Sequence, residues 1–193
     1  MKRKVIYLIV IGLLATVWML YQQWSLARLE NGPKAQQISC VNNLKTIGLA
    51  FRMWASDHGD KYPFQLSTNN SGTLELVSPD QNGFDSNAFV YLRGMNGEDE
   101  LRAPLLLVCP QDKTKLIAGS WTNLSAQNVT YQFRSEASLT PNAAHEILAV
   151  CPFDGNTLYC DGTVLEKNAK PTTKAEATVF DLMKKKLESQ QSK

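Results

Sequence analysis

The longest apolar run in the chain lies at its N-terminus. From Val5 to Ala27 there is no charged side chain, and the basic segment Lys2–Lys4 comes directly before this run. A helix of roughly 20 apolar residues is long enough to cross the hydrocarbon core of a membrane. We therefore expect a membrane anchor over residues 1–30, with its N-terminus on the cytoplasmic side because of the basic flank. A cleaved signal peptide is the alternative that this run leaves open.

A second apolar pattern follows a break in the chain. Asn31-Gly32-Pro33 loosens and then stops a helix, so residues 31–37 are expected to form a hinge. After it, apolar residues recur at steps of three and four, which predicts an amphipathic helix from about Ile38 to Asp57. We expect its apolar face to pack on the core of the domain. The positions that form this face are Ile38, Val41, Leu44, Ile47, Phe51 and Trp54.

The rest of the chain contains short runs typical of strands. Expected strands cover Leu105–Cys109, Val129–Phe133 and Ile147–Cys151, and two more flank the turn Asp161-Gly162 within Thr157–Glu166. Hairpins and short connections favour an antiparallel sheet. The polar segment Lys61–Gly97 is expected to form loops. The pattern as a whole predicts an α+β domain over residues 38–168, in which the amphipathic helix packs on the sheet.

The last part of the chain has a helical pattern of its own. Thr173 and Glu176 stand in the Thr-x-x-Glu order of a capping box. Lys184–Lys186 follow near the expected end of the helix, where cations suit the helix dipole. Residues 169–193 are therefore expected to form a C-terminal helix and tail.

Four cysteines fit an exported domain. Their even number suggests two disulfides, and four cysteines allow three pairings. A Cys151–Cys160 pair would close a short hairpin, and a Cys40–Cys109 pair would tie the amphipathic helix to the sheet. Metal binding by these cysteines has little support, because the sequence has no Cys-x-x-Cys motif and no nearby pair of histidines.

The chain also contains a small internal similarity. Leu106–Asp112 resembles Leu148–Asp154, and both segments contain an apolar run that ends in Cys-Pro-x-Asp. Proline cannot donate a hydrogen bond to a sheet, so each strand is expected to stop there. The aspartate can cap the turn that follows.

Charge and the remaining polar residues exclude several classes of function. A formal charge of +2 over 193 residues gives no basic patch for nucleic acid. The group Asp57-His58-Gly59-Asp60 is better explained as the end of a helix than as a metal site, and His145 has no evident nucleophile as a partner. Asp154 and Asp161 could contribute to a calcium site, although turns explain them better. We expect no catalytic residue, no metal ligand and no cofactor.

Four segments carry a resemblance to a known family. They are Ser39–Ala50, Trp54–Pro63, Leu107–Asp112 and Asn156–Val164. Together they resemble type II secretion pseudopilin-like proteins, the type IV pilin-related proteins of planctomycete- and verrucomicrobia-like bacteria. The matching positions include Asn42, Asn43, Leu44, Trp54, Asp57, His58, Asp161 and Gly162.

The resemblance implies a pilin-like fold and a non-enzymatic role. It implies a structural or accessory subunit of a type II secretion or pilus-like assembly, in contact with the lipid bilayer and with other envelope or pseudopilus proteins. Such a protein would cross the inner membrane once, with its domain exported to the periplasmic side. The resemblance also makes a Cys40–Cys109 disulfide more credible. The chain lacks the prepilin peptidase site of the family, because there is no glycine at the junction of the basic segment and the apolar run. The apolar run also lacks the glutamate that supports filament assembly in the family.

A second hypothesis belongs to another class of function. The polar segment Lys61–Gly97 could form loops that capture glycans or peptides, since binding surfaces are often loops on a rigid scaffold. The protein would then be an anchored extracytoplasmic binding module. A pocket lined by Tyr62, Phe64, Phe84 and Tyr91 would support this hypothesis.

Overall fold

The computed structural model describes the whole chain except residues 1, 31, 96–100, 102 and 167–193. The expected C-terminal helix over residues 169–193 lies outside the described residues. The chain divides after Gln36 into two compact units, which are described separately below.

The N-terminal unit contains the helix α1, Lys2–Glu30. Large apolar side chains along this helix are exposed, among them Ile11, Leu14 and Val17. In the part of the chain that the structure describes, no helix has both the length and the apolar character needed to cross a membrane.

The helix α2, Pro33–Asp57, begins earlier than the sequence pattern predicts. The amide of Gln36 donates to the carbonyl of Gly32 at 3.0 Å, so the first turn of the helix forms directly at the break. Proline suits the first position of a helix because its fixed φ is helical and no partner is needed for its nitrogen. The expected hinge over residues 31–37 is therefore wrong for residues 33–37, which are helical. Gly59, with φ +68°, turns the chain after α2, and the amide of Asp60 closes the end on Ala55.

Five short strands form one antiparallel sheet in the order β1-β2-β3-β4-β5. Their bounds are Phe84–Asp85 for β1, Gln132–Arg134 for β2, Ile147–Val150 for β3, Thr157–Tyr159 for β4 and Val164–Leu165 for β5. The predicted strand at Ile147 and the predicted pair around Asp161-Gly162 are confirmed. The predicted strand over Leu105–Cys109 is wrong, because this segment begins with the 3-10 helix η4, Pro104–Leu107.

The other helices are short and connect these elements. The helix α3 lies within the polar segment that was expected to form loops, as do two 3-10 helices. The helices are α3 at Phe89–Met95, η1 at Pro63–Gln65, η2 at Thr68–Asn70, η5 at Trp121–Asn123 and η6 at Ala126–Asn128.

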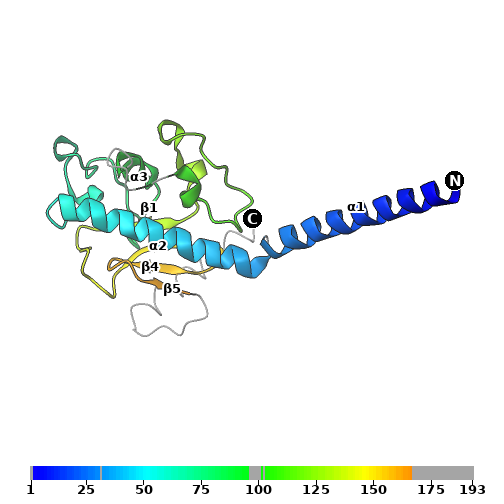
Figure 1. Cartoon of the computed structure of the whole chain (residues 1–193). Helices are drawn as coiled ribbons and strands as arrows, with labels where there is room; N and C mark the ends of the chain where they lie inside the picture. The colour runs from blue at the N-terminus through cyan, green and yellow to red at the C-terminus, as the bar shows by residue number, and fades with distance from the viewer. Residues whose placement is uncertain (1, 31, 96–100, 102, 167–193) are drawn as a thin grey trace. The chain divides into compact units, whose positions relative to one another are not determined.

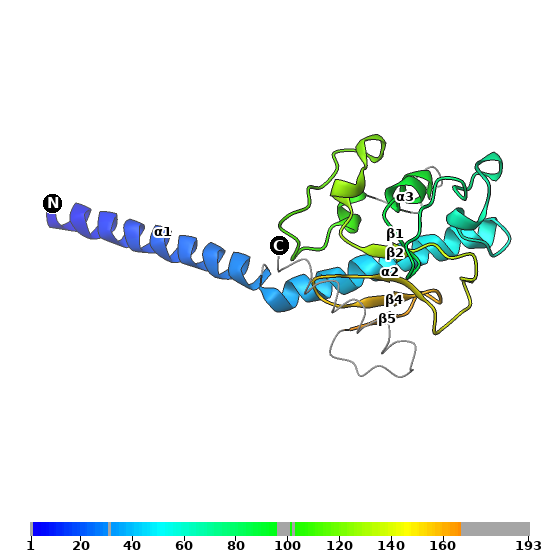
Figure 2. The ribbon, with the colours of Figure 1, turned by 180° about the vertical axis from the view of Figure 1, so that it is seen from behind.

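One face of α2 packs on the sheet, and the core of the domain lies between them (Figure 1). The ring of Phe51 stacks on Phe133 of β2, with 5.7 Å between the ring centroids. Ala149 and Leu158 extend this face across β3 and β4. Seen from behind, α2 again runs alongside the strands (Figure 2). The α+β class is thus confirmed, with α2 packed on an antiparallel sheet.

The helix α2 approaches the β4–β5 hairpin closely. A Cβ atom on Gly48 would lie 2.6 Å from Cδ1 of Leu158 and 3.3 Å from the Cα of Gly162. The guanidinium of Arg52 donates to the carbonyl of Asp161 at 2.8 Å. The hairpin turn itself has only Gly162 at positive φ, so it is a tight turn followed by a glycine rather than the predicted type I′ turn.

Candidate functional site

Four buried side chains converge next to the N-terminal half of α2. We call this group the cysteine cluster. One sulfur or carboxylate oxygen atom from each member lies within 4.8 Å of the corresponding atoms of the other members. None of the four residues is more than 6% exposed. The members of the cysteine cluster are Cys40, Cys109, Cys151 and Asp154.

Three separate segments of the chain supply these side chains. Cys40 lies on the buried face of α2, one turn before Leu44. Cys109 follows η4, and Cys151 directly follows β3. Asp154 lies in the turn that leads from β3 to β4, where the amide of Cys151 donates to the carbonyl of Asn156 at 2.9 Å.

The two Cys-Pro-x-Asp segments form similar turns around their sulfur atoms. The amide of Asp154 donates to Sγ of Cys151 at 3.4 Å. The backbone of Gln111 makes a hydrogen bond to the thiol of Cys109 in the other turn. Proline after each cysteine has no N–H to donate, and the chain turns there, so the amides that follow can approach the sulfur.

The two aspartates of these turns have different partners. One carboxylate oxygen of Asp112 accepts from the amide and hydroxyl of Thr114, at 2.9 and 2.6 Å. Its other oxygen accepts from the hydroxyl of Thr130 at 2.8 Å. Asp154 instead places Oδ2 at 3.4 Å from Sγ of Cys109. Only the second aspartate therefore faces the sulfur atoms.

The three thiols strongly affect one another's acidity. Hydrogen bonds from Cys151 and Cys40 lower the pKa of Cys109 to about 3. The hydrogen bond to Cys109 raises the pKa of Cys151 to about 12 and raises the pKa of Cys40 far above its ordinary value. The arrangement therefore favours a negative charge on the sulfur of Cys109, which the two neighbouring thiols stabilise.

Neither of the expected disulfides is present, because all four cysteines are free. The Cys151–Cys160 prediction is wrong for a geometric reason. The two residues lie at opposite ends of the β3–β4 hairpin, where Cys151 pairs with Asn156 and Cys160 with Glu146. A four-residue strand separates such positions by roughly 13 Å, whereas a disulfide requires Cα atoms within about 7 Å. Cys40 and Cys109 are neighbours, but Cys151 lies equally within their group.

Cys160 is buried elsewhere, beside Tyr62. The hydroxyl of Tyr62 donates to the carbonyl of Cys160 at 3.1 Å. Burial raises the pKa of the Cys160 thiol to about 11. Cys160 thus packs in the core and is not a member of the cysteine cluster.

The family-motif residues on α2 are placed by packing. Leu44 and Trp54 are buried in the core, and Asn42 is exposed. The side-chain amide of Asn43 donates to the carbonyl of Val108 at 3.4 Å and contacts the hydroxyl of Tyr131, which ties α2 to the loop before Cys109.

At the end of α2, the group around His58 belongs to the helix terminus. Asp57 is the last residue of the helix and is exposed. The ring of His58 stacks on Trp54 at 3.6 Å between ring centroids, and its Nδ1 lies 2.7 Å from the Trp54 carbonyl. His145 lies far along the chain on the surface.

The two residues considered as an alternative calcium site, Asp154 and Asp161, lie in different turns. Asp161 lies in the turn after β4, and its Oδ1 accepts from the amide and hydroxyl of Thr163 at 2.9 and 2.7 Å. Asp154 lies in the turn before β4. Because a whole strand separates these turns, the two carboxylates cannot bind one ion.

The aromatic residues expected to line a pocket are buried instead. Tyr62, Phe64 and Tyr91 are at most 1% exposed, and Phe84 is 8% exposed. Phe64 and Tyr91 pack edge to face, with 5.5 Å between their ring centroids. These four residues therefore do not line a pocket that a glycan or peptide could enter.

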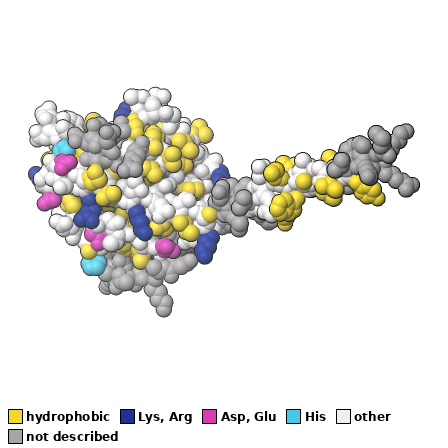
Figure 3. Space-filling model, viewed as in Figure 1, with side chains coloured by type: hydrophobic (Ala, Val, Ile, Leu, Met, Phe, Trp, Pro, Cys, Tyr) yellow, Lys and Arg dark blue, Asp and Glu magenta, His cyan; other side chains and the backbone are white. Residues whose placement is uncertain are grey.

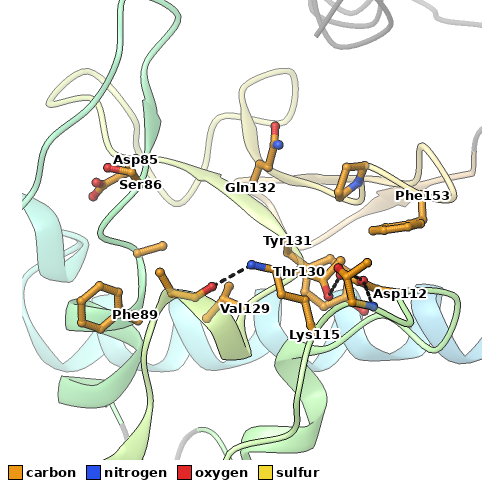
Figure 4. A pocket seen from close by; sticks show the side chains of 14 residues that line it. Asp85, Ser86, Phe89, Asp112, Lys115, Val129, Thr130, Tyr131, Gln132 and Phe153 are labelled. Carbon is orange, nitrogen blue, oxygen red and sulfur yellow. Dashed lines mark hydrogen bonds between the residues drawn. The ribbon is translucent and has the colours of Figure 1, made fainter. Parts of the chain in front are cut away.

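A different cavity of about 360 Å³ opens next to the two Cys-Pro turns. In Figure 4, Asp85, Ser86 and Phe89 lie on one side of it, and Phe153 and Asp112 lie on the opposite side. Lys115 extends between the two sides, and its ammonium group donates to the carbonyl of Ala126 at 2.9 Å. Oδ2 of Asp85 is buried and has no hydrogen-bond partner in the part of the chain that the structure describes.

The sequence does contain a signal for the cysteine cluster. Cys151-Pro152-Phe153-Asp154 has the spacing of Cys-x-x-Cys, with a carboxylate in place of the second sulfur. A search restricted to cysteine and histidine pairs misses it. Cys40 and Cys109 could be added only with the fold known, because they come from distant segments. The missing Cys-x-x-Cys motif therefore does not exclude a metal site.

Comparisons of this chain with models of protein families, with curated proteins and with solved structures gave no match. The resemblance to pseudopilin-like proteins accordingly stays a prediction that depends on the residues given above. Any function of the chain has to be argued from its own fold and side chains.

Proposed function

We propose that this protein is a membrane-anchored, pilin-like structural or accessory subunit of a type II secretion or pilus-like envelope assembly. The observation that carries this proposal is the packing of one long helix, α2, along an all-antiparallel sheet. In the sequence this helix follows closely after α1, which contains the apolar segment.

The side chains of α1 support attachment to a membrane. Tyr7, Leu14, Trp18 and Trp24 are each at least 60% exposed. Figure 3 shows apolar side chains along the described part of this helix. A helix with apolar side chains on every side needs a surrounding of lipid or protein, and aromatic residues near its end suit the lipid headgroup region. The proposed location is the inner membrane, with the domain on the periplasmic side.

The positions of the family-motif residues support a structural role. Leu44 and Trp54 fill the core, Gly162 turns the hairpin, and Asn43 links α2 to the loop before Cys109. Each of these residues serves packing, a backbone turn or a contact with the backbone. Assembly partners would then be other envelope or pseudopilus proteins, which meet the outer surface of the domain.

A charge substitution in the apolar segment tests the anchor. Leu14→Arg places a cation in the middle of the segment, where it costs about 2.5–3.5 kcal/mol of insertion free energy. We expect this variant to leave the carbonate-resistant membrane fraction. Gln23→Arg, near the end of the segment, is the matched control and should remain in it. Intact wild-type chain in the soluble periplasm would contradict the proposal.

Crosslinking in the native envelope tests the assembly. A photoreactive residue at exposed Leu49 on α2 should capture other envelope proteins, and the same residue at buried Ile47 should capture none. Mass spectrometry of the N-terminus shows whether the anchor is retained. A chain that crosslinks to nothing in its native membrane would refute a role as a subunit.

The cavity supports a second candidate, the anchored binding module for glycans or peptides. Its volume of about 360 Å³ lies at the lower end of the range for ligand pockets. The partner-free oxygen of Asp85 could accept a hydrogen bond from a hydroxyl or amine, and exposed Phe153 could stack on a sugar ring. Titration of the protein with chitotriose and with a short peptide library, followed by NMR, would show shifts at the cavity. Equal shifts in an Asp85→Asn variant would argue against this site.

A further inference from the structure

We infer that the cysteine cluster is a buried structural site for one zinc ion. Four ligands at the corners of a tetrahedron, about 2.3 Å from the metal, lie about 3.8 Å from one another. The ligand atoms of the cysteine cluster all lie within 4.8 Å of one another. Small side-chain rotations are therefore enough to bring them to zinc distances, without movement of the backbone.

The types of ligand atom point to zinc. Calcium and magnesium bind oxygen atoms, so three sulfurs in one site exclude them as the preferred ions. A cluster of several irons needs sulfur ligands spread around its outside, and atoms within 4.8 Å leave room for a single ion. Three thiolates and one carboxylate complete a tetrahedral zinc shell. With four protein ligands and no open position, such a site is structural rather than catalytic.

The surroundings of the sulfurs fit bound thiolates. The amide of Asp154 donates to Sγ of Cys151 at 3.4 Å. The backbone of Gln111 makes a hydrogen bond to the Cys109 thiol. Donors of this kind partly neutralise the charge of a thiolate zinc site and fix the directions of its ligands. The sulfurs of the two Cys-Pro turns thus each have a backbone donor.

The number of sulfurs favours a metal over a disulfide. Three cysteines cannot all pair, so any disulfide among them would leave one buried thiol next to the carboxylate of Asp154. One ion uses all four ligands. It would also join α2, the segment after η4 and the β3–β4 hairpin at a single point. Because the site exists only in the folded chain, the free energy of metal binding would stabilise the fold.

The zinc site does not depend on the proposed envelope function. A domain of any function could be held together in this way, so failure of one proposal leaves the other untouched. The two are also separated by their experiments, since metal content does not report on membrane insertion or on crosslinked partners.

Metal analysis of the full chain tests the inference. The protein is purified in detergent without chelator and with a phosphine reductant, and its metals are measured by mass spectrometry. We expect one zinc per chain. After zinc removal, added Co²⁺ should give the strong visible bands of a tetrahedral site and a sulfur-to-cobalt charge-transfer band. Fully reduced wild-type protein that takes up neither zinc nor Co²⁺ would overturn the inference.

Matched substitutions locate the site. Cys109→Ser should abolish the tetrahedral cobalt spectrum, and Cys160→Ser, which removes a buried sulfur outside the cysteine cluster, should preserve it. Asp154→Asn should weaken Co²⁺ binding by roughly tenfold or more. Asp112→Asn, at the equivalent position of the other Cys-Pro turn, should leave the spectrum unchanged.

Two further results would count against the site. One is a peptide crosslinked through a disulfide between any two of the three clustered cysteines in protein purified without reductant and with zinc present. The other is an equal loss of Co²⁺ binding in Cys109→Ser and Cys160→Ser. If Cys109→Ser fails to fold, titration of the reduced wild-type protein still decides the question.

Discussion

The helices α1 and α2 have similar lengths, 29 and 25 residues, but their large apolar side chains differ in exposure. Ile11 and Leu14 on α1 are 62% and 65% exposed, whereas Leu44 and Phe51 on α2 are fully buried. The difference follows from the order of residues. In α2 most apolar residues share one buried face, and polar residues such as Lys45 lie on the other. Ile38, which was expected on the buried face, is exposed, as are Leu49 and Met53.

This comparison shows that apolar content alone does not define a core helix. A helix with one apolar face can pack that face on the sheet of its own domain, as α2 does. The sequence of α1 has no polar face to turn toward water. Its large apolar side chains are exposed within its own unit. Substitutions at matched positions on the two helices should therefore differ sharply in their effects on stability.

The largest difference is expected for a large core side chain. Phe51→Ala removes the ring that stacks on Phe133, and such cavities cost about 3–5 kcal/mol of the free energy of unfolding. Leu13→Ala on α1 should change that free energy by less than about 0.5 kcal/mol, because Leu13 lies outside the domain core. Urea unfolding of the full chain in mild detergent, followed by near-ultraviolet circular dichroism, measures both. Similar losses of unfolding free energy in the two variants would contradict the difference between α1 and α2.

An intermediate difference is expected for two helical glycines. Gly48→Ala places a methyl group 2.6 Å from the buried side chain of Leu158, and overpacking of this kind costs about 1–3 kcal/mol. Gly12→Ala on α1 meets nothing within 4 Å. It should therefore favour the helix by up to about 1 kcal/mol. The same unfolding measurement, together with far-ultraviolet circular dichroism for helix content, checks the two opposite signs.

The smallest effect is expected at the polar edge of α2. Arg52→Met keeps the length of the side chain but loses the hydrogen bond to the Asp161 carbonyl, which contributes about 1 kcal/mol. Lys45→Met, on the exposed face of the same helix, is the control and should have almost no effect. Hydrogen exchange at the amides of the β4–β5 hairpin should rise in the Arg52 variant alone. Unchanged exchange there would mean that this contact does not hold the hairpin on α2.

The elements with a clear period could be predicted from the sequence. The buried face of α2, the strand at Ile147 and the hairpin around Gly162 follow from repeated apolar spacing and from turn residues. The 3-10 helix at Pro104 was missed because a short apolar run has the same pattern in a strand and in a helix. The strand β1 is two residues long, too short for any period to be visible.

The candidate site was harder to predict than the fold. Local spacing picks out two Cys-x-x-Asp pairs, Cys109 with Asp112 and Cys151 with Asp154, but not which of their members share a site. That choice, and the addition of Cys40, depend on the side of α2 that meets the sheet and on the course of the chain after η4. Asp112 shows the limit of sequence patterns, because it stands in the same motif as Asp154 but is held by Thr114 and Thr130.

The packing of α2 on the sheet also determines when the domain can fold. The helix is complete at Asp57, but the strands that cover its apolar face end only at Tyr159. Contacts between such distant segments require long loops to close, so they form slowly and late. A nascent chain that lacks the last hairpin therefore cannot bury the apolar face of α2. The core between α2 and the sheet would therefore be completed only after most of the chain has been made.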